Sequence, residues 1–173
     1  MIPVLYIHGA GAAPEDPPLA DLRRRLGAQY HVLAPELGPP DPATWTARLK
    51  PRLGGIDRCT ILIGHSLGAS HLLRCLAELG PAAVPRALVG LAAPFWGAPE
   101  WSVEGFELPR YAPDALAHLP IRLFHACDDQ TVPVGHLGMW QEALPAARTY
   151  RLDGGGHTFR DNLAPVVMAI AEL

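Results

Sequence analysis

The sequence has no long apolar segment and no excess of basic charge. Nowhere among its 173 residues does an apolar stretch approach the roughly 20 residues that a helix needs to cross a bilayer, so we expect no membrane partner. The formal net charge is -3 at pH 7, which argues against a general affinity for nucleic acid. Apolar residues make up 49% and charged residues 18%, a balance typical of a globular protein with one sizeable core.

Cysteine is scarce and the common metal and nucleotide motifs are missing. Three cysteines at unrelated spacings do not form a disulfide framework or a zinc site, so Cys59, Cys75 and Cys127 are expected to be buried free thiols in a reducing compartment. The chain contains no His-Glu-x-x-His, no Cys-x-x-Cys and no phosphate-binding Gly-x-x-x-x-Gly-Lys-Ser/Thr. We therefore expect no metal and no other cofactor. Because Met1 leads straight into a strand with no signal peptide, the expected location is cytoplasmic.

Short apolar runs alternate with amphipathic helical patterns, and the abundant proline and glycine fall between them. We predict one domain over residues 1–173. Strands are expected at residues 2–7, 31–34, 60–63, 86–92, 121–126 and 148–152. Helices are expected from Asp16 and from Asp41, each an N-cap followed by proline, then after residue 66, at 134–144 and from about Asn162.

This order of elements predicts an α/β fold. Strands separated by helices imply right-handed crossovers, and hence a three-layer sandwich with a mostly parallel sheet of about six strands and helices on both faces. Ligands of such sheets bind beyond the carboxyl ends of the strands. The loops that follow the strands are therefore where a functional site is expected.

The most informative of these loops is Gly64-His65-Ser66-Leu67-Gly68, which follows an apolar run and precedes a helical repeat of leucines. A Gly-x-Ser-x-Gly at such a junction is a nucleophile elbow, a turn so tight that the serine takes a strained backbone conformation. The flanking glycines are needed because a Cβ there would collide with the adjacent strand and helix. Ser66 is the predicted nucleophile, at the positive end of the following helix.

A serine needs a base within hydrogen-bonding reach, and the base needs an orienting acid. After Ser66, the fifth strand ends in Asp128-Asp129-Gln130-Thr131-Val132-Pro133, and the sixth is followed by Gly154-Gly155-Gly156-His157. Either aspartate qualifies as the acid by position. His157 is the predicted base, because three glycines allow its loop to curl over the serine. Four of the other histidines are expected to lie near the site but to pack or hydrogen-bond locally: His8, His65, His71 and His125. The remaining three lie on segments with no predicted approach to Ser66: His31, His118 and His136.

An acyl-transfer enzyme also needs donors for the developing oxyanion. The backbone N–H of Leu67, directly after the nucleophile, is the first. The second is expected from the loop after the first strand, where we assign the N–H of Ala10.

Residues 93–119 carry the candidate substrate pocket. Phe95, Trp96 and Trp101 follow the fourth strand and form either an apolar acyl pocket or a cover for the sheet edge. Glu100, Glu104 and Glu107 are interspersed with them and would disfavour anionic substrates.

From His8-Gly9 through His157, these motifs resemble the α/β-hydrolase superfamily. Within it, the chain is similar to the small, lidless YdeN-type serine hydrolases, whose vertebrate relatives bind retinoblastoma protein. The similarity rests on the N-terminal strand that runs into His-Gly, on Ile-Gly-His-Ser-Leu-Gly, and on Asp-Asp-Gln-Thr-Val-Pro followed by Gly-Gly-His. The resemblance implies a Ser-Asp-His hydrolase on a truncated sheet. It also implies that Asp129, in Asp-x-x-Val-Pro, is the acid, and that Asp128 shapes or hydrates the loop.

The predicted function is therefore a serine hydrolase, carboxylesterase-like, that cleaves small ester or thioester substrates through Ser66, Asp129 and His157 and an acyl-enzyme. Its expected partner is a small-molecule acyl substrate. Two alternatives stay open from the sequence. One is a weakly active protein that mainly binds another protein, and the other is an acyltransferase or peptidase with the same triad.

Overall fold

The computed structural model describes residues 1–13 and 15–173. In this part of the chain the strands are β1 (Ile2–Ile7), β2 (Tyr30–Leu33), β3 (Ile61–His65), β4 (Ala87–Leu91), β5 (Ile121–Ala126) and β6 (Arg148–Leu152). The helices are α1 (Leu19–Leu26), α2 (Pro42–Gly54), α3 (Leu67–Leu79), the short 3-10 helix η1 (Gly80–Ala82), α4 (Ala112–Leu116), α5 (Gly135–Ala143) and α6 (Ala164–Ala171).

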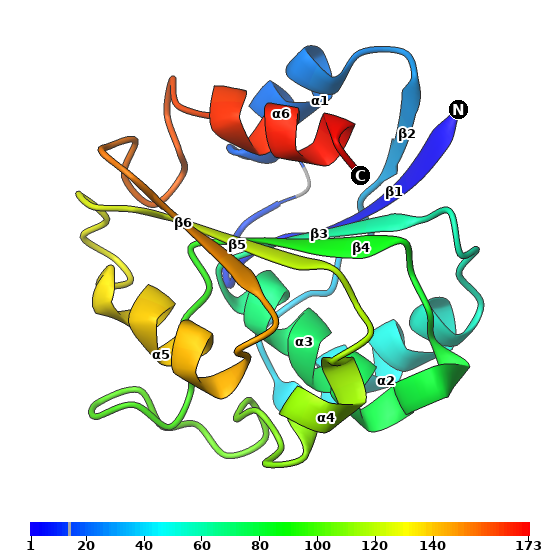
Figure 1. Ribbon diagram of the computed structural model, residues 1–173, viewed down its shortest axis with the longest axis vertical. Helices are drawn as coiled ribbons and strands as arrows, with labels where there is room; N and C mark the ends of the chain where they lie inside the picture. The colour runs from blue at the N-terminus through cyan, green and yellow to red at the C-terminus, as the bar shows by residue number, and fades with distance from the viewer. Residues whose placement is uncertain (14) are drawn as a thin grey trace.

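The strands form one sheet in the order β2-β1-β3-β4-β5-β6, and every neighbouring pair is parallel. Helices α1 and α6 cover one face of this sheet, and α2, α3, α4 and α5 cover the other (Figure 1). The predicted α/β fold with helices on both faces is confirmed. Because all strands run the same way, their carboxyl ends meet at one edge of the sheet, where the predicted site residues lie.

Each face of the sheet has its own apolar core. Every residue of the central strands β3, β4 and β5 is buried, as expected for strands covered on both sides. Helix α2 buries Trp45, Leu49 and Leu53 on the face that it shares with α3, and these are the positions predicted from its periodicity. Together the two cores hold the sheet between its helical layers, which fixes the strand ends relative to one another.

The two Asp-Pro pairs predicted to start helices differ in outcome. Asp41 caps α2 as predicted, since its carboxylate accepts a hydrogen bond of 2.7 Å from the Thr44 amide. Asp16 does not cap α1, because its carboxylate instead accepts from the preceding Ala13 amide at 2.7 Å. Helix α1 begins only at Leu19 with Pro18 as its N-cap, so the predicted N-cap at Asp16 is wrong by two residues.

Other boundaries differ by small amounts. Strand β2 begins one residue early, and α6 begins at Ala164, where Pro165 falls in the first turn as expected. Within residues 93–119, helix α4 and an isolated bridge between Ala98 and Trp101 were not predicted. Cys59 is exposed, in contrast to the predicted burial, because it lies in the turn before β3; Cys75 is buried and Cys127 is intermediate, and all three are free thiols.

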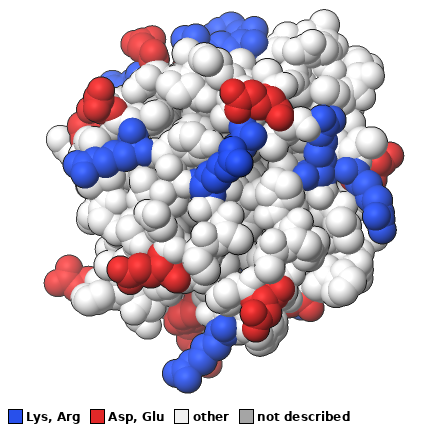
Figure 2. Space-filling model, viewed as in Figure 1, with Lys and Arg blue, Asp and Glu red and all other residues white. Residues whose placement is uncertain are grey.

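The surface carries both signs of charge. Figure 2 shows basic and acidic side chains intermixed over the face seen in Figure 1, with uncharged surface between them. Among the described residues, no helix has the length and apolar character needed to cross a membrane.

Candidate active site

Ser66 lies in the turn between β3 and α3 with a backbone φ of 53° and ψ of -126°. Residues other than glycine seldom adopt a positive φ, so the turn is strained. A Cβ on Gly64 would lie 2.6 Å from the Ala69 nitrogen, and one on Gly68 would lie 2.5 Å from the His8 carbonyl oxygen. The strained turn predicted from the pentapeptide is therefore present, and it closes only because both flanking positions are glycine.

The two amides predicted to bind an oxyanion come from neighbouring elements. Leu67 is the first residue of α3, and Ala10 lies in the exposed turn after β1. Among the described residues, neither N–H donates a hydrogen bond. Gly9, next to Ala10, lies against Ser66, since a Cβ on Gly9 would be 3.0 Å from the Cβ of Ser66. The loop after β1 is thus placed beside the serine.

Asp129 and His157 are joined directly. The Nδ1 of His157 lies 2.8 Å from Oδ2 of Asp129, although the two residues are 28 positions apart in the chain. The other oxygen of Asp129 accepts from the amides of Thr131 and Val132 at 2.8 and 2.9 Å. With Asp129 as acceptor, Nδ1 of His157 is the donor, so in the neutral imidazole Nε2 carries no hydrogen.

The carboxylate of Asp129 is held in its charged form. Its side chain is fully buried, and burial alone would raise its pKa. Hydrogen bonds from His125, His157 and the Val132 amide outweigh the burial, so the pKa of Asp129 lies well below its ordinary value. Asp129 is therefore ionised at neutral pH and can stabilise a positive charge on the imidazole.

Asp128 has a different role from its neighbour. Its carboxylate accepts from the amides of Gly156 and Gly155 at 2.8 and 3.3 Å, and these bonds lower its pKa. Both glycines have positive φ values, 61° and 123°, which glycine adopts without strain. Asp128 thus shapes the loop that carries His157, as the resemblance implied.

His65 connects the loop of His157 to the turn of Ser66. Its Nε2 donates to the backbone oxygen of His157 at 2.8 Å, and the two rings lie 4.8 Å apart between centroids. His65 directly precedes Ser66, so this contact brings the His157 loop to the elbow. In the part of the chain that the structure describes, no hydrogen bond joins Ser66 Oγ to His157.

A family model described as serine hydrolase matches residues 4–162, which is most of the chain. The protein belongs to the serine hydrolase family. No curated protein sequence matches it.

Solved structures with the same fold are distant in sequence from this serine hydrolase. It is similar to the ydeN gene product from B. subtilis, with a TM-score of 0.84 and 21% identity over 99% of this chain and 97% of that one. It is also similar to the esterase domain of a Rhodothermus marinus protein (TM-score 0.69, 20% identity, 99% and 84% covered) and to a pyrethroid hydrolase from Sphingobium faniae (TM-score 0.70, 18% identity, 98% and 96% covered). These matches confirm the compact α/β-hydrolase fold.

The aromatic residues predicted to form a pocket pack closely against one another and the core. The Trp96 ring lies 5.7 Å from that of Trp101, and its Nε1 donates to Ser70 Oγ at 3.0 Å. Phe95 packs edge-on against Trp140 at 5.0 Å. All three candidates are half-buried. This packing favours the alternative that the segment covers the end of the sheet.

Two further histidines lie near Asp129. His125 was expected near the site with local hydrogen bonds, whereas His136 was expected on a segment that does not approach it. The Nε2 of His125 donates to the Val132 carbonyl oxygen at 2.8 Å and lies 3.3 Å from Oδ2 of Asp129. The Nδ1 of His136 accepts from the Phe95 amide at 2.8 Å, which anchors the start of the aromatic segment. A buried histidine at the end of a strand was the available signal, but its partners depend on how the following loop folds.

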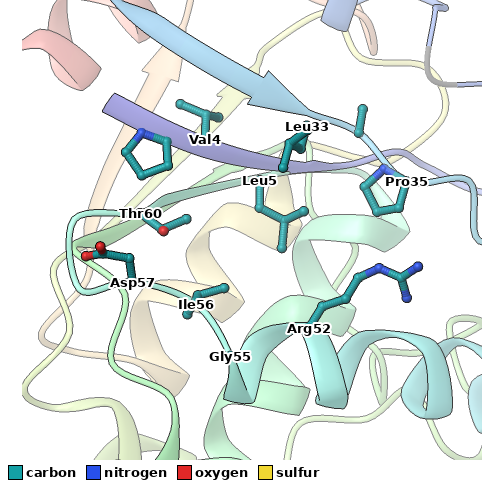
Figure 3. A pocket seen from close by; sticks show the side chains of 11 residues that line it. Val4, Leu5, Leu33, Pro35, Arg52, Gly55, Ile56, Asp57 and Thr60 are labelled. Carbon is teal, nitrogen blue, oxygen red and sulfur yellow. The ribbon is translucent and has the colours of Figure 1, made fainter. Parts of the chain in front are cut away.

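Cavities occur on more than one side of the molecule. A cavity of about 540 Å³ lies under β1 and β2 near the carboxyl end of α2, lined by Leu5, Leu33 and Arg52 among others (Figure 3). It contains none of the predicted site residues. Another, of about 500 Å³, is lined by His8 and by the loops after β1 and β2. Among the described residues, no group of three or more His, Cys, Asp or Glu side chains is arranged to hold a metal ion.

Two buried histidines should make the free energy of unfolding fall in mild acid. Burial, followed by the proximity of His157, lowers the pKa of His65 to about 4, and burial, followed by Arg74, lowers that of His71 to about 4. An unfolded histidine titrates near pH 6.5, so between pH 6.5 and 4 the unfolded chain binds more protons than the folded one. The free energy of unfolding should therefore fall as the pH is lowered through this window, by up to about 3 kcal/mol for each histidine.

Urea denaturation at pH 7, 5.5 and 4.5 measures this slope. The variant His71→Gln removes one of the two histidines and should reduce the dependence of the free energy of unfolding on pH. Asp129 lowers this free energy further only below about pH 4, where unfolded carboxyls titrate. An unchanged slope in His71→Gln would mean that His71 titrates alike in both states.

Proposed function

We propose that this serine hydrolase cleaves small carboxylic esters or thioesters with Ser66 as nucleophile, His157 as base and Asp129 as the orienting acid. Ser66 Oγ attacks the carbonyl carbon while Nε2 of His157 takes its proton. The amides of Leu67 and Ala10 donate to the oxyanion. His157 then gives the proton to the leaving alcohol or thiol, and a water activated by the same imidazole releases the acid and restores Ser66.

The observation that carries this proposal is the 2.8 Å bond between His157 Nδ1 and the buried, ionised Asp129. It fixes the tautomer with a free Nε2, the form that a general base requires. The bond forms beside a serine held in a strained turn, where the first amide of α3 is free to donate. Catalytic hydrogen bonds are often long before substrate binds, so we expect the contact between Ser66 and His157 to tighten in the complex.

The segment of residues 93–119 favours small substrates. Among the described residues it forms no separate domain, and its side chains, including Phe106 and Trp96, pack on the core. An open site of this kind suits short acyl groups better than long lipids.

Labelling with a fluorophosphonate tests the proposal. The native protein should be modified covalently at Ser66, because the triad makes its hydroxyl reactive, and Ser66→Ala should not be labelled. Ser102→Ala is the matched control, since Ser102 is an exposed serine away from the elbow and its loss should leave labelling unchanged.

A lack of labelling in the folded native protein would contradict the proposal and favour a protein-binding role. If labelling occurs, release of acid from p-nitrophenyl acetate is followed with and without added hydroxylamine. Acid as the main product in water indicates a hydrolase, whereas product that forms only with the added nucleophile indicates an acyltransferase.

A further inference from the structure

His125 is a buried histidine to which the proposed reaction gives no part. It lies in strand β5, and only 1% of its surface is exposed. Its Nε2 lies 2.8 Å from the carbonyl oxygen of Val132, so this nitrogen carries a hydrogen and donates it. Strand β5 pairs with β4 on one side and with β6 on the other. Because the backbone is fixed in the sheet and the ring is enclosed, the direction of this donor is fixed too.

The same nitrogen faces the proposed acid. Nε2 of His125 lies 3.3 Å from Oδ2 of Asp129. That oxygen is the one that accepts from Nδ1 of His157 at 2.8 Å. Two imidazoles therefore converge on one carboxylate oxygen, one from within the sheet and the other from the loop after β6.

These contacts close the loop that carries the acid. Asp129 lies between His125 and Val132 in the chain, and the bond between those two residues joins the ends of this stretch. Within it, the amides of Thr131 and Val132 donate to Oδ1 of Asp129 at 2.8 and 2.9 Å. The side chain of Asp129 is fully buried, so these groups take the place of water around the carboxylate. The loop thus presents Oδ2 to His157 in one orientation.

The orientation matters because the acid must stay within hydrogen-bonding reach of the base. A displacement of about 1 Å at a reacting centre can lower a rate about 10²-fold. Without His125, the Val132 carbonyl oxygen would lose this donor, and Oδ2 of Asp129 would lose its contact with the sheet. The carboxylate would then be free to move away from Nδ1 of His157.

We propose that His125 is a positioning residue, which acts through Asp129 by holding its carboxylate against Nδ1 of His157. The inference rests on the proposed function, because it assigns a further residue to the same reaction. Two consequences distinguish this role from that of a histidine that only stabilises the fold. Loss of His125 should lower kcat with little change in KM, and the loss of rate cannot exceed the one caused by Asp129→Asn.

Variants that differ in the reach of their donor test the proposal. Glutamine places an amide N–H near the position of Nε2, asparagine places it near that of Nδ1, and leucine has no donor. With p-nitrophenyl acetate, kcat should fall about 10- to 100-fold in His125→Leu and His125→Asn, with KM changed by less than about threefold. His125→Gln should keep kcat close to the native value.

His71→Gln is the matched control. His71 is also a buried histidine, and its Nε2 lies 3.1 Å from Thr46 Oγ1. Among the described residues it forms no hydrogen bond with the triad, so its substitution should leave kcat unchanged. Circular dichroism shows which variants fold. Should His125→Leu not fold, the comparison of His125→Gln with His125→Asn decides.

A double-mutant cycle separates the proposed role from a general loss of stability. In Asp129→Asn, the further change His125→Leu should alter kcat by less than about twofold, because the carboxylate through which His125 acts is already gone. Losses that add in full would overturn the proposal, and so would equal kcat values in His125→Gln and His125→Asn. If either result is found while native Ser66 is labelled and acetate is hydrolysed, only the role of His125 is wrong. If native Ser66 is neither labelled nor active, both proposals fall together.

Discussion

Asp129→Asn is expected to lower kcat by about 10³- to 10⁴-fold while the protein stays folded. In the native site, one carboxylate oxygen of Asp129 accepts from two backbone amides and the other from His157. An asparagine keeps its oxygen on the amides and turns its NH₂ toward Nδ1 of His157. The histidine must then accept at Nδ1 and carry its proton on Nε2, which faces the serine. In that tautomer it cannot take the proton of Ser66.

The matched control for this variant is Asp128→Asn. Asp128 is the adjacent carboxylate, but it bonds the amides of Gly155 and Gly156 and makes no contact with the imidazole in the described structure. Its asparagine variant can still accept from one amide, so kcat should fall by no more than about tenfold. Steady-state kinetics with p-nitrophenyl acetate measures both variants. A larger loss in Asp128→Asn than in Asp129→Asn would reverse the assignment of the acid.

The sequence predicted the elements of the site whose chemistry is local. Gly64 and Gly68 predict a close approach of strand and helix, because only glycine has no Cβ to collide there. The structure shows this approach. His157 and the pair Asp128-Asp129 could be selected because parallel strands bring their carboxyl ends to one edge, whatever the details of packing. The choice of Asp129 over Asp128 came from the resemblance. The bond between Asp129 and His157 depends on that topology.

Other features depend on contacts that no local pattern encodes. His125 binds the carbonyl oxygen of Val132, seven residues on, and His136 binds the amide of Phe95 from an earlier segment. Each bond exists only after the loop or the neighbouring element has taken its final path. Asp16 illustrates the same limit within a single turn, since its carboxylate accepts from the Ala13 amide and does not cap helix α1.

The second large effect is expected on the fold itself. Gly68→Ala should destabilise the protein by more than about 4 kcal/mol, a large part of the 5–15 kcal/mol that holds a typical domain together. The new Cβ would lie 2.5 Å from the carbonyl oxygen of His8 and would also overlap that of Ile7. Both obstacles are backbone atoms at the end of β1, so no side chain can rotate away. Relief requires that α3 move away from the sheet, which exposes the core beneath it.

Gly138→Ala is the matched control for this prediction. Gly138 lies inside helix α5 on the exposed surface, and a Cβ there meets no atom within 4 Å. Alanine has the better helix propensity, so this variant should be stabilised by about 0.4–1 kcal/mol. Urea denaturation followed by circular dichroism measures both proteins. A Gly68→Ala variant with the native midpoint would show that α3 does not approach β1 this closely, and the strained geometry of Ser66 would lose its structural cause.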